Sequence, residues 1–360
     1  MRVIISAGGT GGHIYPALAI LKKIKEHEPN SAFLYIGTNN RMEKDIVPLE
    51  HIDFIGIEMY GFNRKNLFKN FKTLKCLITS KRKLKKIIKK FNPDIVIGAG
   101  GYITYPVITV AHKLGYKTFI HEQNSVAGKA NKIMSKYVDL IGISIKDSMD
   151  FFPKDKTIFT GNPCSTNAIN AKEVKKESLG LKQDKKLIVI VMGSLGASNV
   201  HLFMKENLHR FKCKNYEVLY ICGKNNYDDI KDIKYPSNVK VVSYVNSLTG
   251  LLKNTNLLIT RAGASTLSEI IALKIPSILI PSPFVPNNHQ YKNAISLVNN
   301  KAALLLEEKD LSFEKLDALI DKLLNDKKNY LDMKKNLQSM QVKDSAEIIY
   351  KNIKKLVDRK

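Results

Sequence analysis

Tryptophan is absent from this 360-residue chain, cysteine occurs only four times, and no apolar run reaches the roughly 20 residues that a membrane-spanning helix needs. Cys76, Cys164, Cys213 and Cys222 show neither paired nor metal-ligand spacing, which argues against a disulfide framework and a zinc site. A short apolar run follows Met1 almost directly, without the layout of a signal peptide. These absences favour a cytoplasmic protein with reduced thiols.

Arginine is also scarce, although the formal net charge is +25. Only 7 of the 58 basic residues are arginine, whereas proteins that bind phosphates or bases usually favour its bidentate side chain. The charge therefore argues weakly for nucleic acid, and we expect no nucleic-acid partner. The excess is local, because residues 64–90 hold 12 basic side chains and no acidic one.

The length favours two domains, since single hydrophobic cores stop growing beyond about 250–300 residues. In the first half, short apolar runs alternate with helical or loop segments. This alternation is typical of an α/β protein with a parallel sheet and helices on both faces. The expected strands are Val3–Ile5, Phe33–Ile36, Phe54–Ile57, Ile95–Ile97, Thr118–Ile120 and Ile158–Phe159.

The turn Gly161-Asn162-Pro163 is the expected hinge, and a second alternating pattern follows it. An amphipathic helical pattern over residues 344–357 ends the chain. We therefore predict two similar, doubly wound halves that face each other over a cleft. The strands expected in the second half are Leu187–Val191, Val218–Ile221, Val239–Val242, Leu257–Ile259 and Ser277–Ile280.

A glycine-rich turn, Gly8–His13, follows the first expected strand and leads into a helix. Glycines let the backbone approach a ligand closely, and a helix N-terminus attracts anions. Two better-known glycine loops do not fit. Ile14 stands where the dinucleotide fingerprint needs its last glycine, and His13 stands where a phosphate loop needs lysine. The turn predicts an anion site ending in a histidine that can carry a proton, and the alternative is an ordinary tight turn.

Two further polar or glycine-rich segments, Gly98–Tyr102 and His121–Asn124, also follow expected strands of the first half. The carboxyl ends of parallel strands meet at one edge of a sheet, where ligands of open α/β sheets bind. We therefore expect both segments to converge with Gly8–His13.

In the second half, Thr260–Glu269 reads as a strand end, a glycine turn and a helix start. Ser265 and Thr266 would open a helix whose N–H groups can hold a diphosphate. Glu269 would lie on the face above Ser265, where its carboxylate could accept hydrogen bonds from both hydroxyls of a ribose. The alternative is a Ser/Thr helix cap with a reciprocal glutamate.

The basic segment contains an amphipathic pattern, because Leu67, Phe71, Leu74 and Ile78 would share one helix face with lysines around it. Such a helix can rest on an anionic membrane surface. It can equally be a surface helix whose apolar face lies in the core. Periodicity does not distinguish these two interpretations.

Several segments stand in the order and spacing of one known family: Gly8–His13, Gly100–Tyr102, His121–Asn124, Gly161–Pro163, Gly193-Ser194, Arg261–Glu269 and Gln290–Ala294. Over essentially its whole length the chain resembles the MurG family, the peptidoglycan N-acetylglucosaminyltransferases of glycosyltransferase family 28. The resemblance implies a GT-B fold with Rossmann-like domains over residues 1–161 and 162–342. It also implies that a helix within residues 343–360 crosses back to the first domain.

The resemblance implies a reaction as well. Members of this family move GlcNAc from UDP-GlcNAc to the C4 hydroxyl of MurNAc in lipid I, undecaprenyl-diphospho-MurNAc-pentapeptide. The transfer is inverting, gives lipid II and UDP, and needs no metal or other cofactor. Lipid I is anchored by its polyprenyl tail, so the implied location is the anionic inner leaflet on the cytoplasmic side of the cell membrane.

Two rivals stay open. One is another UDP-sugar enzyme of GT-B fold, either a UDP-sugar 2-epimerase or a different glycosyltransferase. The other is a non-enzymatic nucleic-acid or membrane-binding protein that uses the basic segment.

Carried over position by position, the family's UDP-GlcNAc site draws on both halves of the chain. Its residues here are Thr10, Gly11, Gly12, Asn124, Ser194, Val245, Arg261, Ala264, Ser265, Thr266, Leu267, Ser268, Glu269 and Gln290. The resemblance places Arg261 near the diphosphate. The acceptor-side residues are Gly100, Gly101, Tyr102 and His121.

Some positions depart from the family's pattern. Cys164 and Ser165 stand where the family usually has an arginine after Gly-Asn-Pro. Leu195 stands in place of a polar residue in the second glycine turn, and His289 replaces the first glutamine of a pair. Individual donor contacts are therefore expected to differ from those of the family.

The chemistry needs a base for the acceptor hydroxyl and stabilisation of the leaving diphosphate. His13 is the expected general base, because an imidazole works near its own pKa at neutral pH. Glu122 is the second candidate, and a loop hydrogen-bond donor is the alternative role for His13. The helix start at Ala264–Thr266, with Arg261 nearby, is expected to stabilise the diphosphate without a cation.

Overall fold

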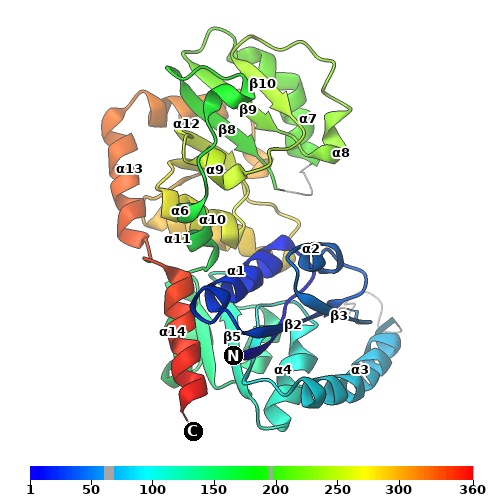
Figure 1. Cartoon of the computed structure of the whole chain (residues 1–360). Coiled ribbons are helices and arrows are strands. Elements are labelled where there is room, and N and C mark those ends of the chain that lie inside the picture. The colour runs from blue at the N-terminus through cyan, green and yellow to red at the C-terminus, as the bar shows by residue number, and fades with distance from the viewer. Residues whose placement is uncertain (61–68, 194–197, 360) are drawn as a thin grey trace. The chain divides into compact units, whose positions relative to one another are not determined.

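The computed structural model describes residues 1–60, 69–193 and 198–359, apart from the side chains of residues 69–72, 74 and 75. The chain forms two compact units (Figure 1). Unit 1 comprises Met1–Cys164 and Lys343–Lys360, and unit 2 comprises Ser165–Val342. Among the described residues, no helix is both long and apolar enough to cross a membrane.

Unit 1 is built on a seven-stranded sheet in which every paired strand is parallel. The strand order is β3-β2-β1-β4-β5-β6-β7, so the chain reverses direction across the sheet between β1 and β4. The bounds are β1 Arg2–Ser6, β2 Ala32–Thr38, β3 Asp53–Ile57, β4 Ile95–Gly98, β5 Lys117–Glu122, β6 Leu140–Ile143 and β7 Thr157–Phe159. The strands expected in this half are confirmed, and β6 is an additional one.

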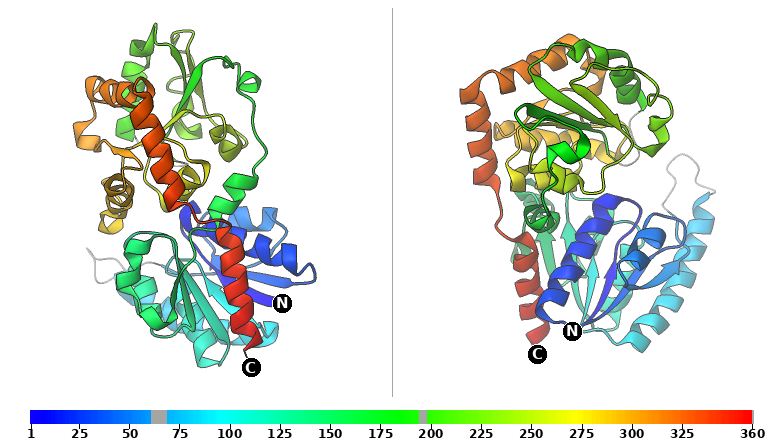
Figure 2. Two further views of the ribbon diagram at one scale, coloured as in Figure 1. Left: turned by 90° about the vertical axis from the view of Figure 1, so that its left-hand side faces the viewer. Right: turned by 45° about the horizontal axis from the view of Figure 1, so that its top comes forward.

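Helices cover both faces of this sheet (Figure 2). Side chains alternate between the faces, so Ile4 joins the core beneath α3 and α4 while Val3 and Ile5 join the core beneath α1 and α14. The helices of the unit are α1 Gly11–His27, α2 Glu43–Leu49, α3 Lys69–Phe91, α4 Thr104–Lys113, α5 Lys129–Met134 and α14 Ser345–Asp358.

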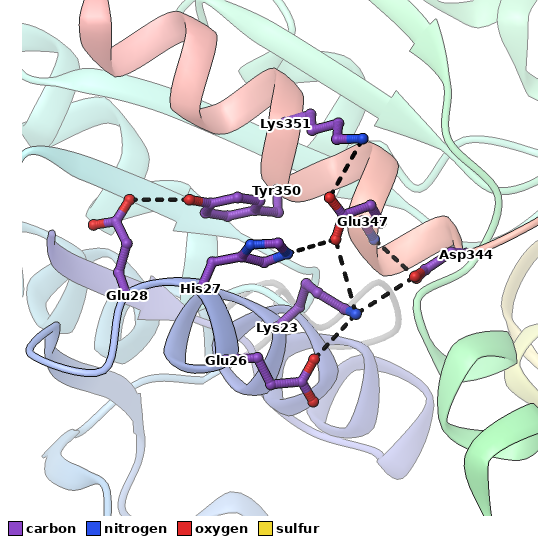
Figure 3. Close-up of polar contacts among 8 residues, drawn as sticks. All are labelled: Lys23, Glu26, His27, Glu28, Asp344, Glu347, Tyr350 and Lys351. Atoms are coloured by element: carbon purple, nitrogen blue, oxygen red, sulfur yellow. Dashed lines mark hydrogen bonds and ion pairs between the residues drawn. The ribbon is translucent and has the colours of Figure 1, made fainter.

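Helix α14 returns to unit 1 and packs along α1, which confirms the expected crossing (Figure 3). Ile349 and Ile353 are fully buried in the core that α1 also joins. At the polar edge, the His27 ring stacks on Tyr350 with centroids 4.2 Å apart, and its Nε2 lies 2.6 Å from Glu347 Oε2. Lys23 Nζ lies 3.5 Å from Asp344, the residue whose side chain caps α14.

In the described part of α3, some apolar side chains are buried and others are exposed. Leu84 and Ile88 are fully buried in the core against α4, and Leu77 is partly buried there, whereas Ile78 is 51% exposed. The later turns of the helix therefore place apolar side chains inside the protein, whereas Ile78, a member of the predicted apolar face, is exposed. Leu67 and the side chains of Phe71 and Leu74 lie outside the described residues.

Unit 2 repeats the strand order of unit 1 with six parallel strands, β10-β9-β8-β11-β12-β13. The expected strands of the second half are confirmed, and the two-residue β13 is additional. The strands are β8 Lys186–Val191, β9 Tyr216–Ile221, β10 Val239–Val242, β11 Leu257–Thr260, β12 Ser277–Leu279 and β13 Leu304–Leu305. The fold is α/β with two doubly wound, Rossmann-like units.

The helices that follow these strands share one large apolar core with the sheet of unit 2. Helix α6, Cys164–Asn170, begins at the last residue before this unit. The others are α7 Ser198–Asn207, α8 Lys224–Tyr227, α9 Leu248–Leu252, α10 Ala264–Leu273, α11 His289–Asn299, α12 Phe313–Leu324 and α13 Lys327–Met340. Short 3₁₀ turns lie at Lys146–Phe151, Lys154–Lys156, Lys176–Leu179, Leu208–Phe211, Pro286–Asn288 and Glu308–Asp310.

Candidate functional site

The first glycine turn joins β1 to α1 at the carboxyl edge of the sheet in unit 1. Gly9 has a positive φ of 97°, and Thr10 is the extended N-cap of α1, without a side-chain cap bond. The first N–H groups of a helix have no partner within it. Gly11 and Gly12, which start this helix, therefore offer N–H groups toward solvent, as the sequence predicted for an anion site.

His13 lies in the first turn of α1, and its ring is held by the turn that precedes it. Its Nδ1 lies 3.0 Å from the carbonyl oxygen of Gly8, and only the protonated nitrogen can donate to a carbonyl. The neutral ring therefore carries its hydrogen on Nδ1 and its lone pair on Nε2. A Cβ at Gly100, which has a φ of 107°, would collide with this ring.

The three predicted loop segments of unit 1 do converge. The Gly8 N–H donates to the carbonyl of Gly100 at 3.1 Å, and a Cβ at Gly101 would lie 2.5 Å from Gly8 O. Gln123 Nε2 donates to the carbonyl of Ala99 at 3.0 Å. Tyr102 is 36% exposed, and its hydroxyl accepts a hydrogen bond from Arg41 at 3.1 Å. The loops thus form one continuous hydrogen-bonded edge.

Glu122 is buried, and its carboxylate organises the loop that follows β5. Oε1 accepts from the backbone N–H and the side-chain amide of Asn124, at 3.0 and 3.1 Å. Oε2 accepts from Gly128 N at 2.9 Å and Asn131 Nδ2 at 2.8 Å. With four hydrogen bonds to residues of the loop after β5, Glu122 holds that loop in place.

His121 was expected on the acceptor side, and in the structure its ring is an internal group at the end of β5. The ring is 0% exposed; Nε2 lies 3.0 Å from the Gly161 carbonyl and Nδ1 lies 3.2 Å from Gln123 Nε2. Burial lowers the pKa of His121 to about 4, against the weaker opposing effect of its bond to Gly161. His121 is therefore a neutral internal link between β5 and the Gly161 turn and has no surface that could meet a substrate.

In unit 2, the second anion-binding candidate is the start of α10. Gly263 is its extended N-cap, no side chain caps the helix, and Ala264 is its first residue. Ser265 Oγ is buried and has no hydrogen-bond partner among the residues that the structure describes, and Ser268 Oγ donates to Ser265 O at 2.6 Å. The alternative of a reciprocal Ser/Thr–Glu cap is therefore wrong, because Ser265 lies inside the helix rather than at its cap.

Glu269 is half-buried one turn into α10. Within the described part of the chain, its carboxylate has no hydrogen bond or ion pair, and desolvation raises its pKa to about 7. A desolvated carboxylate is stabilised by a ligand that brings hydrogen-bond donors. The hydroxyls of a ribose are donors of that kind.

Arg261, expected near the diphosphate, directly follows β11. The guanidinium is buried, lies 2.6 Å from a carboxylate oxygen of Glu308, and donates to the Ile280 carbonyl at 3.0 Å. A buried cation needs such a partner, and here the partner comes from the segment after β13. Arg261 thus links the segments that follow neighbouring strands of unit 2.

The other donor-site positions differ in what they can offer. Ala264 and Thr266 are partly exposed, Val245 is buried after β10, and Gln290 Oε1 accepts from Ser282 N at 2.9 Å. The Leu267 side chain is 1% exposed in the core, and its N–H donates to Gly263 O at 2.9 Å. Ser194 lies outside the described residues.

Comparison with known proteins shows which family the chain belongs to. The glycosyltransferase family 28 N-terminal domain matches residues 3–143, and the family's C-terminal domain matches residues 187–349. A Bacillus cytotoxicus protein named UDP-N-acetylglucosamine--N-acetylmuramyl-(pentapeptide) pyrophosphoryl-undecaprenol N-acetylglucosamine transferase is 43% identical over 364 residues, covering all of both chains. The chain belongs to glycosyltransferase family 28.

Further relatives agree with this assignment. A Bacillus licheniformis protein of the same name is 42% identical over 99% of both chains. The crystal structure of Acinetobacter baumannii MurG superposes with a TM-score of 0.79 at 23% identity, over 98% of this chain and 99% of that one. A putative UDP-N-acetylglucosamine 2-epimerase from Listeria monocytogenes has a TM-score of 0.70 at 14% identity. These structural likenesses show the GT-B fold.

The chain departs from the family's pattern at Cys164 and Ser165, after the Gly161 turn, and both residues are buried. Cys164 is 4% exposed, and its N–H donates to the side-chain oxygen of Asn162 at 3.0 Å. Ser165 is also buried. Neither side chain can supply the reach or the charge of the arginine that the family usually has at this point.

Two glutamates that hold these loops, Glu43 and Glu308, were not predicted from the sequence. Glu43 accepts hydrogen bonds from Gly9 N and from Thr38, and Glu308 pairs with Arg261. Each lies more than 30 residues from the loop that it holds, so no local spacing links them. The signal that could have pointed to Glu43 is its place shortly after Gly37-Thr38, at the end of a strand beside β1.

Proposed function

We propose that this chain is the glycosyltransferase that moves GlcNAc from UDP-GlcNAc to the C4 hydroxyl of MurNAc in lipid I, forming lipid II and UDP. The observation that carries this proposal is the 43% identity, over the full length of both chains, to a protein named for that reaction. The loops and helix starts described above supply groups suited to it.

Unit 2 holds the nucleotide in this proposal. The start of α10 offers N–H groups and the positive end of the helix to the diphosphate. Glu269 accepts hydrogen bonds from the ribose hydroxyls, which would satisfy a carboxylate that burial otherwise destabilises. Ser265 Oγ, buried without a partner at the same helix start, is a further group that a bound ligand would satisfy.

Unit 1 supplies the base. The acceptor C4 oxygen attacks the anomeric carbon of GlcNAc while the bond from that carbon to the diphosphate breaks, and inversion follows from attack opposite the leaving group. The C4 hydroxyl proton passes to His13 Nε2, the ring nitrogen that carries the lone pair when Nδ1 donates to Gly8. The negative charge that develops on UDP is stabilised at the start of α10.

Membrane association belongs to the same proposal. Lipid I would present its sugar at the cytoplasmic surface of an anionic leaflet, and residues 64–90 carry 12 basic side chains and no acidic one. Such a concentration of lysine is attracted to anionic lipid by roughly 1 kcal/mol per side chain near the surface. Peripheral binding through this segment would keep the enzyme at its acceptor.

The test is an assay of the full chain with UDP-GlcNAc and a short-chain lipid I analogue. We expect equal amounts of UDP and of a product heavier than the acceptor by one GlcNAc residue, measured by chromatography and mass spectrometry. A reaction without acceptor is the control, because conversion of UDP-GlcNAc to its 2-epimer there would assign the chain to the epimerase alternative. Absence of the disaccharide product with intact acceptor would overturn the proposal.

A further inference from the structure

In the turn Gly8–His13, the N–H and the carbonyl of one peptide group both form hydrogen bonds to side chains. The N–H of the Gly8–Gly9 peptide, on Gly9 N, lies 3.1 Å from Glu43 Oε2. Its carbonyl, Gly8 O, accepts from His13 Nδ1 at 3.0 Å. A carboxylate and an imidazole are thus joined through a single amide.

Glu43 is 0% exposed, and the fold makes room for it. Its Oε1 accepts from Thr38 N at 3.0 Å and from Thr38 Oγ1 at 2.6 Å. A Cβ at Gly8 would lie 2.6 Å from Oε1, and a Cβ at Gly37 would lie 2.6 Å from Cγ. Gly8, in the turn after β1, and Gly37, on the neighbouring strand β2, therefore make room for the carboxylate directly behind the turn.

No lysine or arginine among the described residues forms an ion pair with Glu43, so its charge acts on the dipoles around it. A hydrogen bond to an anion polarises an amide and makes its carbonyl oxygen a stronger acceptor. Here that oxygen is the acceptor for His13 Nδ1–H. The stronger acceptor favours the Nδ1–H tautomer and stabilises the imidazolium that forms when Nε2 takes a proton.

We propose that Glu43 is a positioning residue that acts through the Gly8–Gly9 peptide to orient His13 and strengthen its Nε2 as a base. The proposal rests on the assignment of His13 as the base. It follows the logic of a catalytic triad, in which a carboxylate fixes the tautomer of a histidine, except that a backbone amide stands between the two groups.

The other titratable groups near this relay do not replace it. Tyr35, on β2, donates its hydroxyl to Ala7 O at 3.1 Å; burial, and then the charge of Glu43, hold its pKa well above the ordinary value. Tyr35 therefore stays neutral. Arg41 and Tyr102 lie at the exposed rim, where they bond to each other.

The test compares Glu43→Gln with Tyr35→Phe, which removes a neutral hydrogen bond to the same turn. Saturating kcat is measured as a function of pH with the lipid I analogue. We expect Glu43→Gln to lower kcat about tenfold and to move the acid limb of the profile to lower pH, because a weaker base is deprotonated at lower pH. Tyr35→Phe should leave the limb in place. Equal, unshifted profiles for both variants would overturn the relay.

A double-mutant cycle separates this proposal from the function itself. In a His13→Ala background, Glu43→Gln should change kcat less than about twofold, because the group that it acts on is gone. An undiminished effect there would make Glu43 merely structural. If His13→Ala alone keeps kcat, the base assignment fails; if His13→Ala loses activity while Glu43→Gln leaves the profile in place, only the relay fails.

A measurement on the unaltered protein covers the case in which Glu43→Gln does not fold. Nitrogen-15 NMR of ring-labelled histidine, with the His13 signal assigned from its loss in His13→Ala, reports the tautomer directly. We expect a hydrogen on Nδ1 at neutral pH. A neutral ring with its hydrogen on Nε2 and none on Nδ1 would contradict the relay whatever the variants do.

Discussion

The two units share a strand order but treat the polar groups at their strand ends differently. In unit 1, the carboxylates of Glu43 and Glu122 are buried and hold three and four hydrogen bonds respectively. In unit 2, Glu269 has no partner among the described residues, and Ser265 Oγ is buried without one. The two carboxylates of unit 1 are thus satisfied by the protein's own groups, whereas the carboxylate of Glu269 in unit 2 has no such partner among the described residues.

This difference separates two tasks that a glycosyltransferase must perform. A base has to be held in one tautomer and direction before the acceptor arrives, which needs a preorganised surround. A nucleotide site gains affinity when the ligand satisfies groups that the free protein leaves without partners. The carboxylates of unit 1 provide a preorganised surround, and Glu269 of unit 2 is a group that a ligand would satisfy.

We expect the largest loss of activity from a change in the loops that hold His13 in unit 1. Gly100→Ala places a Cβ against the His13 ring at a φ of 107°, and a displacement of about 1 Å at a catalytic group can cost 100-fold in rate. We expect kcat to fall by about that factor, measured with the lipid I analogue.

Gly115→Ala is the matched control, because Gly115 has a φ of 79° and a Cβ added there would meet nothing within 4 Å. It carries similar backbone strain without touching the site. An equal loss of kcat in both variants would show that strain, and not contact with His13, is responsible.

In unit 2, we expect removal of the Glu269 charge to weaken nucleotide binding and to stabilise the free protein. Glu269→Gln keeps the shape but removes the charge, and we expect UDP-GlcNAc to bind about 10- to 100-fold more weakly by calorimetry, the range for hydrogen bonds to a charged group. The free variant should nevertheless unfold at a higher temperature than the parent above pH 7.

The direction of this change in stability follows from the shifted pKa of Glu269. Burial raises the pKa of Glu269 to about 7, so the folded protein carries a penalised charge above that pH. The penalty fades as the pH falls from 7 toward the ordinary pKa of a glutamate, about 4.3. A variant less stable than the parent at pH 8 would contradict this account of Glu269.

The contact between α1 and α14 offers a smaller test inside unit 1. Burial opposes ionisation of Glu347, but His27 and Lys351 outweigh it and lower its pKa. Its stabilising effect is therefore present above the ordinary pKa and lost as the pH falls through the lowered value. Glu347→Gln should cost under about 1 kcal/mol at pH 7, by thermal unfolding, and progressively less below pH 4. A constant difference across pH would contradict this.

The smallest expected effect concerns the membrane. Replacing Leu67, Phe71 and Leu74 with serine should lower binding to phosphatidylglycerol vesicles severalfold while UDP-GlcNAc binding persists, because apolar side chains add to electrostatic attraction. Leu331→Ser, at an exposed leucine of unit 2, is the control. Unchanged vesicle binding would remove this segment from membrane association.

Local pattern was sufficient for much of the fold. Apolar runs such as Val3–Ile5 and Leu187–Val191 are buried on both faces of a parallel sheet, so they are visible without tertiary information. Strand β6 was missed, since Gly142 interrupts its short run, and β13 has only two residues. The convergence of the three loops in unit 1 followed from topology alone.

The site was harder to predict because burial decides what a polar side chain does. His121 matched a functional position, and the structure shows that its ring is internal; Arg261 matched another, and the structure shows that it pairs with Glu308. The partners in these contacts, His121 with Gly161 and Arg261 with Glu308, lie 40 and 47 positions apart in the chain, which no motif spacing reports. The resemblance to the family located the loops, and only the fold distinguishes groups that face solvent from groups that hold the loops together.

Single-turnover transfer at saturating UDP-GlcNAc, compared between the parent, His13→Ala and Glu269→Gln, tests the division of labour most directly. We predict that His13→Ala slows the chemical step by at least about 100-fold, the usual contribution of a general base, with little change in donor affinity. Glu269→Gln should recover a near-parental rate once the donor is saturating. A His13→Ala protein with the parental rate would contradict the assignment of catalysis to unit 1.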